Sequence, residues 1–244
     1  MSYNKRPEMI LFDVGGTLFD DGKCIPADGF EALRLSATNP EVTTAEEMAK
    51  YWDKYLAEVS GIKSQSGGIL DIPLSAVIRY TTMNTGLRFQ ISMAEQEEIF
   101  DRFNSTREVL NGTKELLSTL NNMGIRTAVI SNNMMSGDSL ELAIKHWLPS
   151  SDFEFCLTSA DILFTKPCED IFRAAMSYAG LEAEDCWYCG DSFIPDVLGS
   201  SRCGMTPVLI DTKASAPIEY KEAESGTYLV VNNWHHLTDF LKNL

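Results

Sequence analysis

The chain has 244 residues, of which 44% are hydrophobic and 23% charged, as expected for a globular protein with one large domain or a core carrying a smaller insertion. Its 35 acidic and 20 basic residues give a formal net charge of -15. Such a surface repels nucleic acid and anionic membranes, so we expect neither as a partner. An anionic substrate would need a local positive centre, supplied by a bound metal or a well-placed lysine.

Targeting signals and cysteine spacing also limit the possible classes. The opening "MSYNKRPEM" has no apolar segment of the kind a secretory signal needs, and no apolar run has the length of a membrane-spanning helix, so we expect a cytoplasmic protein. Cys186 and Cys189 form a C-x-x-C spacing, but no second pair completes a zinc site. We interpret them as buried, reduced cysteines on opposite faces of a strand.

The predicted elements begin with a buried strand over residues 9–14. Four helical patterns follow, at residues 27–37, 44–61, 73–86 and 92–105, separated by Gly, Pro and Ser. They interrupt what is otherwise a strand–helix alternation. We interpret residues 22–108 as a helical cap inserted after the first strand, able to close over a site.

The second half of the chain alternates regularly. Helices are predicted at residues 111–124, 136–148, 166–180, 194–204 and 234–244, and strands at 125–131, 153–159, 185–191, 205–211 and 227–233. This order predicts an α/β core with a doubly wound, Rossmann-like parallel sheet covered on both faces. The core would comprise residues 1–21 and 109–244.

Polar residues fall at the ends of several predicted strands or in the turns beyond them. They are Asp13, Ser131-Asn132, Lys166-Pro167, Gly190-Asp191 and, in the next helix, Asp196. Taken singly, each has an ordinary explanation as a turn residue, a helix start or a helix-dipole partner. Because ligands of such sheets bind beyond the carboxyl ends of the strands, the combination predicts one site there.

The combination resembles the haloacid dehalogenase (HAD) superfamily of hydrolases across nearly the whole chain. Four motifs in order carry the resemblance: "DVGGTL" at 13–18, Ser131-Asn132 after "AVI", "TKPCEDIF" around Lys166, and "GDSFIPDVLGSSRCGM" containing Asp191 and Asp196. The helical insertion occupies the position of the family's cap, between its first two motifs. The resemblance implies hydrolysis of a small-molecule phosphorylated substrate.

The resemblance also implies a role for each matching residue. Asp13 would be the nucleophile that forms an aspartyl-phosphate, and Lys166 a catalytic cation that helps keep Asp13 ionised. Mg²⁺, which prefers oxygen ligands, would be held by Asp13, the backbone carbonyl of Gly15 and Asp191. Asp196 would orient Lys166 or metal-bound water. The substrate-binding residues would be Ser131, Asn132 and Thr17.

Gly15 departs from the family's pattern. Family phosphatases usually carry a second aspartate two residues after the nucleophile, and it transfers protons to the leaving group and from water. Glycine keeps the carbonyl but has no side chain for this task. Asp20 and Asp21 are close in sequence, but we interpret them as turn residues leading to the cap. Gly15→Asp is therefore expected to raise activity more on poor than on good leaving groups.

Three functions are compatible with this pattern. The first is a Mg²⁺-dependent phosphohydrolase of small metabolites that works without the usual acid. The second is a dehalogenase or a phosphonatase. Dehalogenases also lack the second aspartate, but they typically lack an acid matching Asp191. Phosphonatases need a lysine from the cap, and the candidates are Lys50, Lys54 and Lys63. The third is a non-catalytic protein that binds a phosphorylated ligand. Neither the substrate nor the oligomeric state can be inferred from the sequence.

Overall fold

A seven-stranded sheet forms the centre of the protein in a computed structural model that describes residues 3–65, 70–223 and 226–244. The strand order is β5-β4-β1-β6-β7-β9-β8. The strands are β1 (Met9–Phe12), β4 (Arg126–Ser131), β5 (Cys156–Thr158), β6 (Cys186–Gly190), β7 (Thr206–Ile210), β8 (Ile218–Ala223) and β9 (Gly226–Val231). All neighbouring pairs are parallel except β8 with β9. The expected Rossmann-like α/β fold is confirmed.

The antiparallel strand β8 was not expected from the sequence. Its sequence "IEYKEA" mixes charged and apolar residues, and its side chains are only half-buried or exposed. It lies at the edge of the sheet, where one side of a strand remains unpaired. A strand with so little buried surface lacks the apolar run that marks the central strands.

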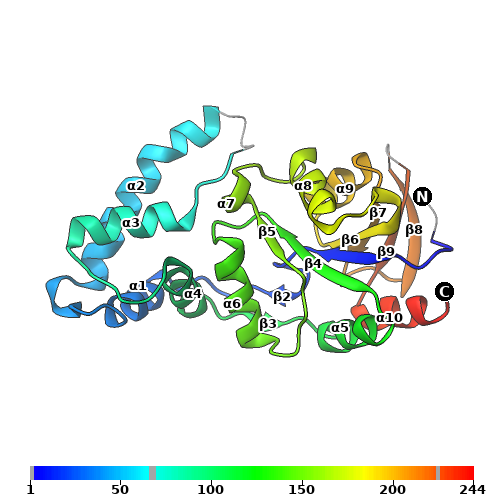
Figure 1. The fold of residues 1–244 in the computed structure, drawn as a ribbon, viewed down its shortest axis with the longest axis horizontal. Coiled ribbons are helices and arrows are strands. Elements are labelled where there is room, and N and C mark those ends of the chain that lie inside the picture. The colour runs from blue at the N-terminus through cyan, green and yellow to red at the C-terminus, as the bar shows by residue number, and fades with distance from the viewer. Residues whose placement is uncertain (1–2, 66–69, 224–225) are drawn as a thin grey trace.

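Helices cover both faces of the sheet, as Figure 1 shows. One face packs against α5 (Thr113–Asn122), α6 (Gly137–Trp147) and α10 (Trp234–Lys242), and the other against α8 (Glu169–Ala179). Short helical turns complete the core: α7 (Ser159–Ile162), η2 (Ala183–Asp185), η3 (Phe193–Leu198) and α9 (Gly199–Arg202). Alternate residues of a strand enter opposite cores, so Cys189 packs on the first face and Cys186 on the second, both as buried free thiols.

In the described part of the segment between β1 and α5, four helices extend from one end of the sheet, far from both chain termini (Figure 1). They are α1 (Pro26–Leu35), α2 (Ala45–Gln65), α3 (Leu74–Thr85) and α4 (Met93–Asn104), with a short turn η1 (Pro40–Val42). We call residues 22–108 the helical insert. All four overlap the helices expected from the sequence. In the described ranges, no helix combines the length and hydrophobicity needed to cross a lipid bilayer.

Two short strands connect the insert to the core. They are β2 (Phe19–Asp20) and β3 (Glu108–Val109), which pair with each other in antiparallel fashion. The chain therefore leaves and re-enters the core at adjacent points.

Polar contacts also anchor the insert directly on the core. Glu97 of α4 is fully buried, and its Oε2 accepts hydrogen bonds from the backbone nitrogen and hydroxyl of Ser136, at 2.9 and 2.7 Å. The Ser159 hydroxyl donates to Asp71 Oδ2 at 2.6 Å. Ser136 also caps the start of α6 by accepting from the nitrogen of Ser139. The insert thus packs on α6 as well as on the two connecting strands.

Candidate active site

A small pocket of about 230 Å³ lies at the carboxyl ends of the central strands. We call it the strand-edge pocket. β1 runs toward the insert in Figure 1, and Asp13 follows it directly. The pocket is lined by residues expected from the sequence, namely Asp13, Gly15, Ser131, Asn132, Lys166 and Asp196, and by others that were not, including Asp21, Arg107, Asn133 and Ser192. The fold therefore brings together segments far apart in the chain.

Lys166 is the buried cation at the centre of this pocket. Its Nζ lies 2.9 Å from Asp13 Oδ1 and 2.7 Å from Asp196 Oδ1, and donates to the Tyr188 hydroxyl at 2.8 Å. Tyr188 in turn donates to the carbonyl of Ile130 at 2.8 Å, which fixes it as an acceptor for the lysine. Burial opposes the charge on Lys166, but Asp13 and Asp196 outweigh burial and raise its pKa. The lysine therefore stays protonated beside Asp13.

Asp196 is occupied on both carboxylate oxygens. Oδ1 contacts Lys166, and Oδ2 accepts from the backbone nitrogen of Ser192 at 2.9 Å. Burial raises the pKa of this carboxyl, whereas the charge of Lys166 acts in the opposite direction. This geometry suits the orienting role expected for Asp196 better than direct metal binding.

Asn132 holds the main chain of Lys166. Its Oδ1 accepts from the Lys166 nitrogen at 2.7 Å, and its Nδ2 donates to the Lys166 carbonyl at 3.0 Å. Both ends of the amide thus contact the main chain of Lys166, and because Asn132 also lines the pocket, its role in substrate binding stays a prediction. Ser131, at the end of β4, is a pocket-lining residue with 3% exposure.

Thr17 lies away from the pocket wall. The residue is fully buried, and its carbonyl accepts from Trp234 Nε1 at 2.8 Å. Thr17, expected to bind substrate, is thus not among the residues that line the strand-edge pocket. The residue instead ties the loop after β1 to helix α10.

Three carboxylates form a cluster with the chemistry of a metal site. Asp13, Asp191 and Asp196 each offer one oxygen, and these oxygens lie within 4.8 Å of one another. Because Asp196 is already engaged, Asp13 and Asp191 are the pair that remain for a cation. The pKa of Asp191 is raised by burial and, to a smaller extent, by the negative charge of Asp13. A divalent cation between the two carboxylates would offset their mutual repulsion. The residues present therefore fit an oxygen-coordinated divalent ion.

The loop after β1 is shaped to admit Asp191. Gly16 has φ +67°, and a Cβ built on it would collide with the Asp191 carboxyl group. A side chain at this position is therefore disfavoured both by the backbone and by the approaching acid. The second glycine of "DVGGTL" thus has a structural reason at the candidate metal site.

Tyr188 and Arg107 were not expected at the site, and Asp21 was interpreted as a turn residue leading to the cap. Tyr188 lies within the buried strand β6, where an aromatic residue gives no sign of a polar contact. Arg107 lies just before β3, and its guanidinium brings a second positive charge to the pocket. Asp21 follows Asp13 by several residues and was therefore not expected at the site. The turn after β1 brings it back to the pocket that Asp13 lines.

The lysines considered for a phosphonatase are not placed for that role. Lys50 and Lys54 lie exposed on α2, and neither lines the strand-edge pocket. The side chain of Lys63 lies outside what the structure describes. The structure therefore offers no support for Schiff-base chemistry by Lys50 or Lys54.

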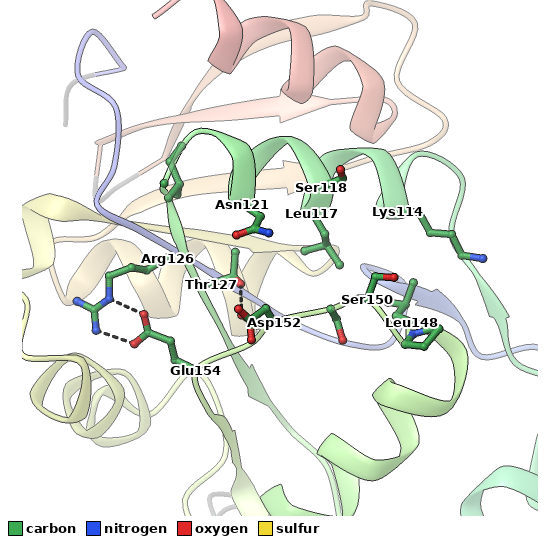
Figure 2. Close-up of a pocket in the computed structure, with 14 residues that line it drawn as sticks. Lys114, Leu117, Ser118, Asn121, Arg126, Thr127, Leu148, Ser150, Asp152 and Glu154 are labelled. Carbon is green, nitrogen blue, oxygen red and sulfur yellow. Dashed lines mark hydrogen bonds and ion pairs between the residues drawn. The ribbon is translucent and has the colours of Figure 1, made fainter.

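A larger cavity of about 590 Å³ lies elsewhere, between α5 and the segment that follows α6. Figure 2 shows Arg126 facing Glu154, with Arg126 Nε 2.6 Å from a carboxylate oxygen, and Thr127 bonded to the carbonyl of Asp152. Arg126 begins β4 whereas Ser131 ends it, so the two cavities lie at opposite ends of one strand. The carboxylate cluster lies beside the smaller cavity, which is the better candidate for the active site.

The fold, the ordered motifs and the buried carboxylate–lysine cluster define a class of hydrolase. The chain belongs to the haloacid dehalogenase-like hydrolases, whose pattern it matches over residues 10–210. It is 27% identical over 237 residues to the glyceraldehyde 3-phosphate phosphatase of Methanothermobacter thermautotrophicus, covering 95% of this chain and 98% of that one.

One further relative and one solved structure are also similar to this chain. The chain is 28% identical over 113 residues to haloacid dehalogenase-like hydrolase domain-containing protein 3 of Xenopus laevis, covering 46% of this chain and 45% of the relative. The match thus spans about half the length of that relative. The fold of this chain is similar to that of the HAD-hydrolase YfnB of Bacillus subtilis, solved with magnesium bound. The TM-score is 0.56 at 18% identity, and the match covers 98% of this chain and 100% of YfnB.

Proposed function

We propose that the protein is a Mg²⁺-dependent phosphohydrolase that forms an aspartyl-phosphate on Asp13. The observation that carries the proposal is the position of Lys166 Nζ, 2.9 Å from Asp13 Oδ1, with the Asp191 carboxylate close enough to share a cation. The phosphatase relative from Methanothermobacter thermautotrophicus, similar over nearly the whole chain, supports a small phosphorylated metabolite as substrate. The size of the pocket, about 230 Å³, suits such a molecule.

The residues of the pocket would divide the chemistry between them. Asp13 and Asp191, with the Gly15 carbonyl, would hold Mg²⁺, which when bound neutralises phosphate charge and orients it for attack. An oxygen of Asp13 would attack phosphorus while the bond to the leaving oxygen breaks. Lys166 offsets the negative charge of carboxylate and phosphate, and Ser131 would donate a hydrogen bond to a phosphate oxygen.

The groups around Lys166 would keep this arrangement fixed. Asp196 and Tyr188 hold its ammonium group, and Asn132 holds its main chain. Preorganised charge of this kind lowers the barrier because it needs no rearrangement during the reaction. We further propose that the helical insert is a cap domain, residues 22–108, on a core of residues 1–21 and 109–244.

A metal-dependent activity screen tests this function. The purified protein would be assayed for phosphate release from glyceraldehyde 3-phosphate, other small phosphate esters and p-nitrophenyl phosphate, with Mg²⁺ and after chelation. We expect Mg²⁺-dependent turnover that Asp13→Asn abolishes. Asp53→Asn, the same change at an exposed position on α2, is the matched control and should retain activity. Undiminished turnover by the Asp13 variant would contradict the proposal.

Gly15 gives one reason to keep a dehalogenase as the second candidate. Halide leaves without a proton, so a dehalogenase does not need the side chain that Gly15 lacks. Metal-independent halide release from a 2-haloacid, without phosphate release from any ester, would favour this alternative. If neither reaction occurs but phosphorylated compounds raise the melting temperature, a ligand-binding function becomes the better account.

A further inference from the structure

The space beside Gly15 is filled by the carboxyl group of another residue, Asp21. A Cβ built on Gly15 would collide with Asp21 Oδ2 and would lie 3.3 Å from its Cγ and 3.6 Å from Oδ1. Gly15 is absent from the residues with positive φ, so its backbone alone does not require glycine. A side chain at residue 15 would instead have to displace the Asp21 carboxyl group, which already occupies that place.

A tight turn brings Asp21 back over the end of β1. The carbonyl of Val14 accepts from the nitrogens of Leu18 and Phe19, at 2.9 and 3.1 Å, and the nitrogen of Gly16 donates to the carbonyl of Phe19 at 2.7 Å. The chain thus reverses within a few residues and enters β2. Asp21 follows β2 and lines the strand-edge pocket with Asp13.

Arg107 holds this carboxyl group from the other connecting strand. Its Nε donates to Asp21 Oδ1 at 3.3 Å, which leaves Oδ2 as the oxygen that faces Gly15. The guanidinium is itself fixed, since both Nη atoms donate to Asp101 at 2.7 and 3.3 Å and only 9% of the Arg107 side chain is exposed. The orientation of Asp21 is therefore set by a rigid partner.

A purely stabilising role explains this arrangement less well. Asp21 has a side chain that is 57% exposed, and ion pairs with exposed groups contribute little to stability. Such a pair has no reason to be directed into a pocket that contains Asp13 and Lys166. The Asp21 carboxyl group instead lies beside Gly15, the residue that lacks the proton-transferring side chain of family phosphatases.

We propose that Asp21 supplies the acid and base chemistry that Gly15 cannot, a role that rests on the phosphohydrolase function proposed above. In the first half-reaction the Asp13 oxygen bonds to phosphorus, the bond from phosphorus to the leaving oxygen breaks, and the Asp21 carboxyl gives its proton to that oxygen. In the second, water attacks phosphorus, the bond to Asp13 breaks, and Asp21 takes a proton from the water. Phosphate leaves, and both carboxyl groups return to their starting forms.

Two esters that differ mainly in their leaving group test this role. For Asp21→Asn, we expect kcat/KM to fall by ~10²-fold or more on phenyl phosphate, a poor leaving group, and by about tenfold at most on p-nitrophenyl phosphate. The variant should also release a burst of nitrophenolate close to the enzyme concentration, because the aspartyl-phosphate accumulates without a base. Asp20→Asn changes the neighbouring exposed acid and is the matched control. It should leave the ratio of kcat/KM on the two esters unchanged and should show no burst of nitrophenolate.

A relocated acid separates catalysis from structure. Gly15→Asp alone must displace the Asp21 carboxyl, so the simple gain expected from the sequence no longer follows. In the double variant Gly15→Asp/Asp21→Gly the space is vacant, and we expect activity on phenyl phosphate to recover above that of Asp21→Gly.

The possible results separate the role of Asp21 from the phosphohydrolase function on which it rests. If Asp13→Asn abolishes turnover but Asp21→Asn lowers both esters equally, or neither, the role of Asp21 is refuted and the phosphohydrolase stands. If the wild-type protein hydrolyses no phosphate ester of the screen described above with Mg²⁺, the phosphohydrolase function is refuted, and the role of Asp21 is refuted with it.

Discussion

Removing the buried charge of Lys166 should destabilise the folded protein as well as inactivate it. Only 2% of the Lys166 side chain and 1% of the Asp196 side chain are exposed, and their charged atoms lie 2.7 Å apart. Lys166→Met would leave Asp196 as a buried carboxylate without a cation. Breaking a buried pair in this way typically costs about 3–5 kcal/mol.

The cost translates into a measurable melting shift. For a chain of this size, each kcal/mol lowers the melting temperature by about 2–4 °C, so Lys166→Met should melt about 6–20 °C below the wild type. Differential scanning calorimetry or a circular dichroism melt provides the measurement. Lys166→Met/Asp196→Leu removes both charges of this pair, and the double variant should be more stable than the single one, because the Asp196 carboxylate is no longer left buried without its cation.

The pH dependence provides a second, independent readout. Burial already raises the pKa of Asp196 although Lys166 opposes the rise, so removing Lys166 should raise it further. A carboxyl group whose folded pKa lies above its unfolded pKa binds protons more readily in the folded chain, so stability rises as the pH falls through the folded value. The deficit of Lys166→Met should therefore be smaller at pH 5.5 than at pH 7.5. A melting temperature within about 2 °C of wild type, unchanged with pH, would refute this account of the buried cluster.

Three further predictions concern the turn after β1, the candidate metal site and the exposure of the cysteine thiols. Trp234→Phe removes the donor to the Thr17 carbonyl and should cost about 1–3 kcal/mol in urea unfolding, whereas an unchanged midpoint would show that water replaces the bond. Gly16→Ala places a Cβ against Asp191, and the Mg²⁺ concentration for half-maximal activity should rise ~10-fold or more; an unaltered metal requirement would place the ion elsewhere. Iodoacetamide at pH 8 should label exposed Cys24 before the buried thiols of β6, one of which has its pKa raised by burial to about 11, and equal labelling would contradict the packing described.

The sheet could be predicted because its strands are apolar runs bounded by turn residues. The polar residues Asp13, Ser131 and Asp191 come after or at the ends of three adjacent parallel strands, and parallel strands end at the same edge. Their proximity therefore follows from strand direction alone. The edge strand β8 could not be predicted in this way, because its half-exposed, charged side chains carry no comparable signal.

The partners of the site residues were harder to predict. Tyr188 looks like any aromatic residue of a buried strand, and only its packing against Lys166 shows that its hydroxyl accepts a hydrogen bond. Asp21 and Arg107 are 86 residues apart, so nothing in the sequence indicates that they meet. Contacts that depend on a turn or on the packing of side chains need the folded chain to be recognised.

The short β2–β3 ladder also bears on how proteins with this core can diversify. Both crossings between core and insert pass through it, with Phe19 paired to Val109 and Asp20 to Glu108. Since entry and exit stay side by side, the order of the strands in the core does not depend on the length of the chain between them. Descendants of such a gene can lengthen, shorten or exchange the intervening helices while the sheet is inherited intact, and, if the proposed cap function holds, such changes alter which molecules reach Asp13.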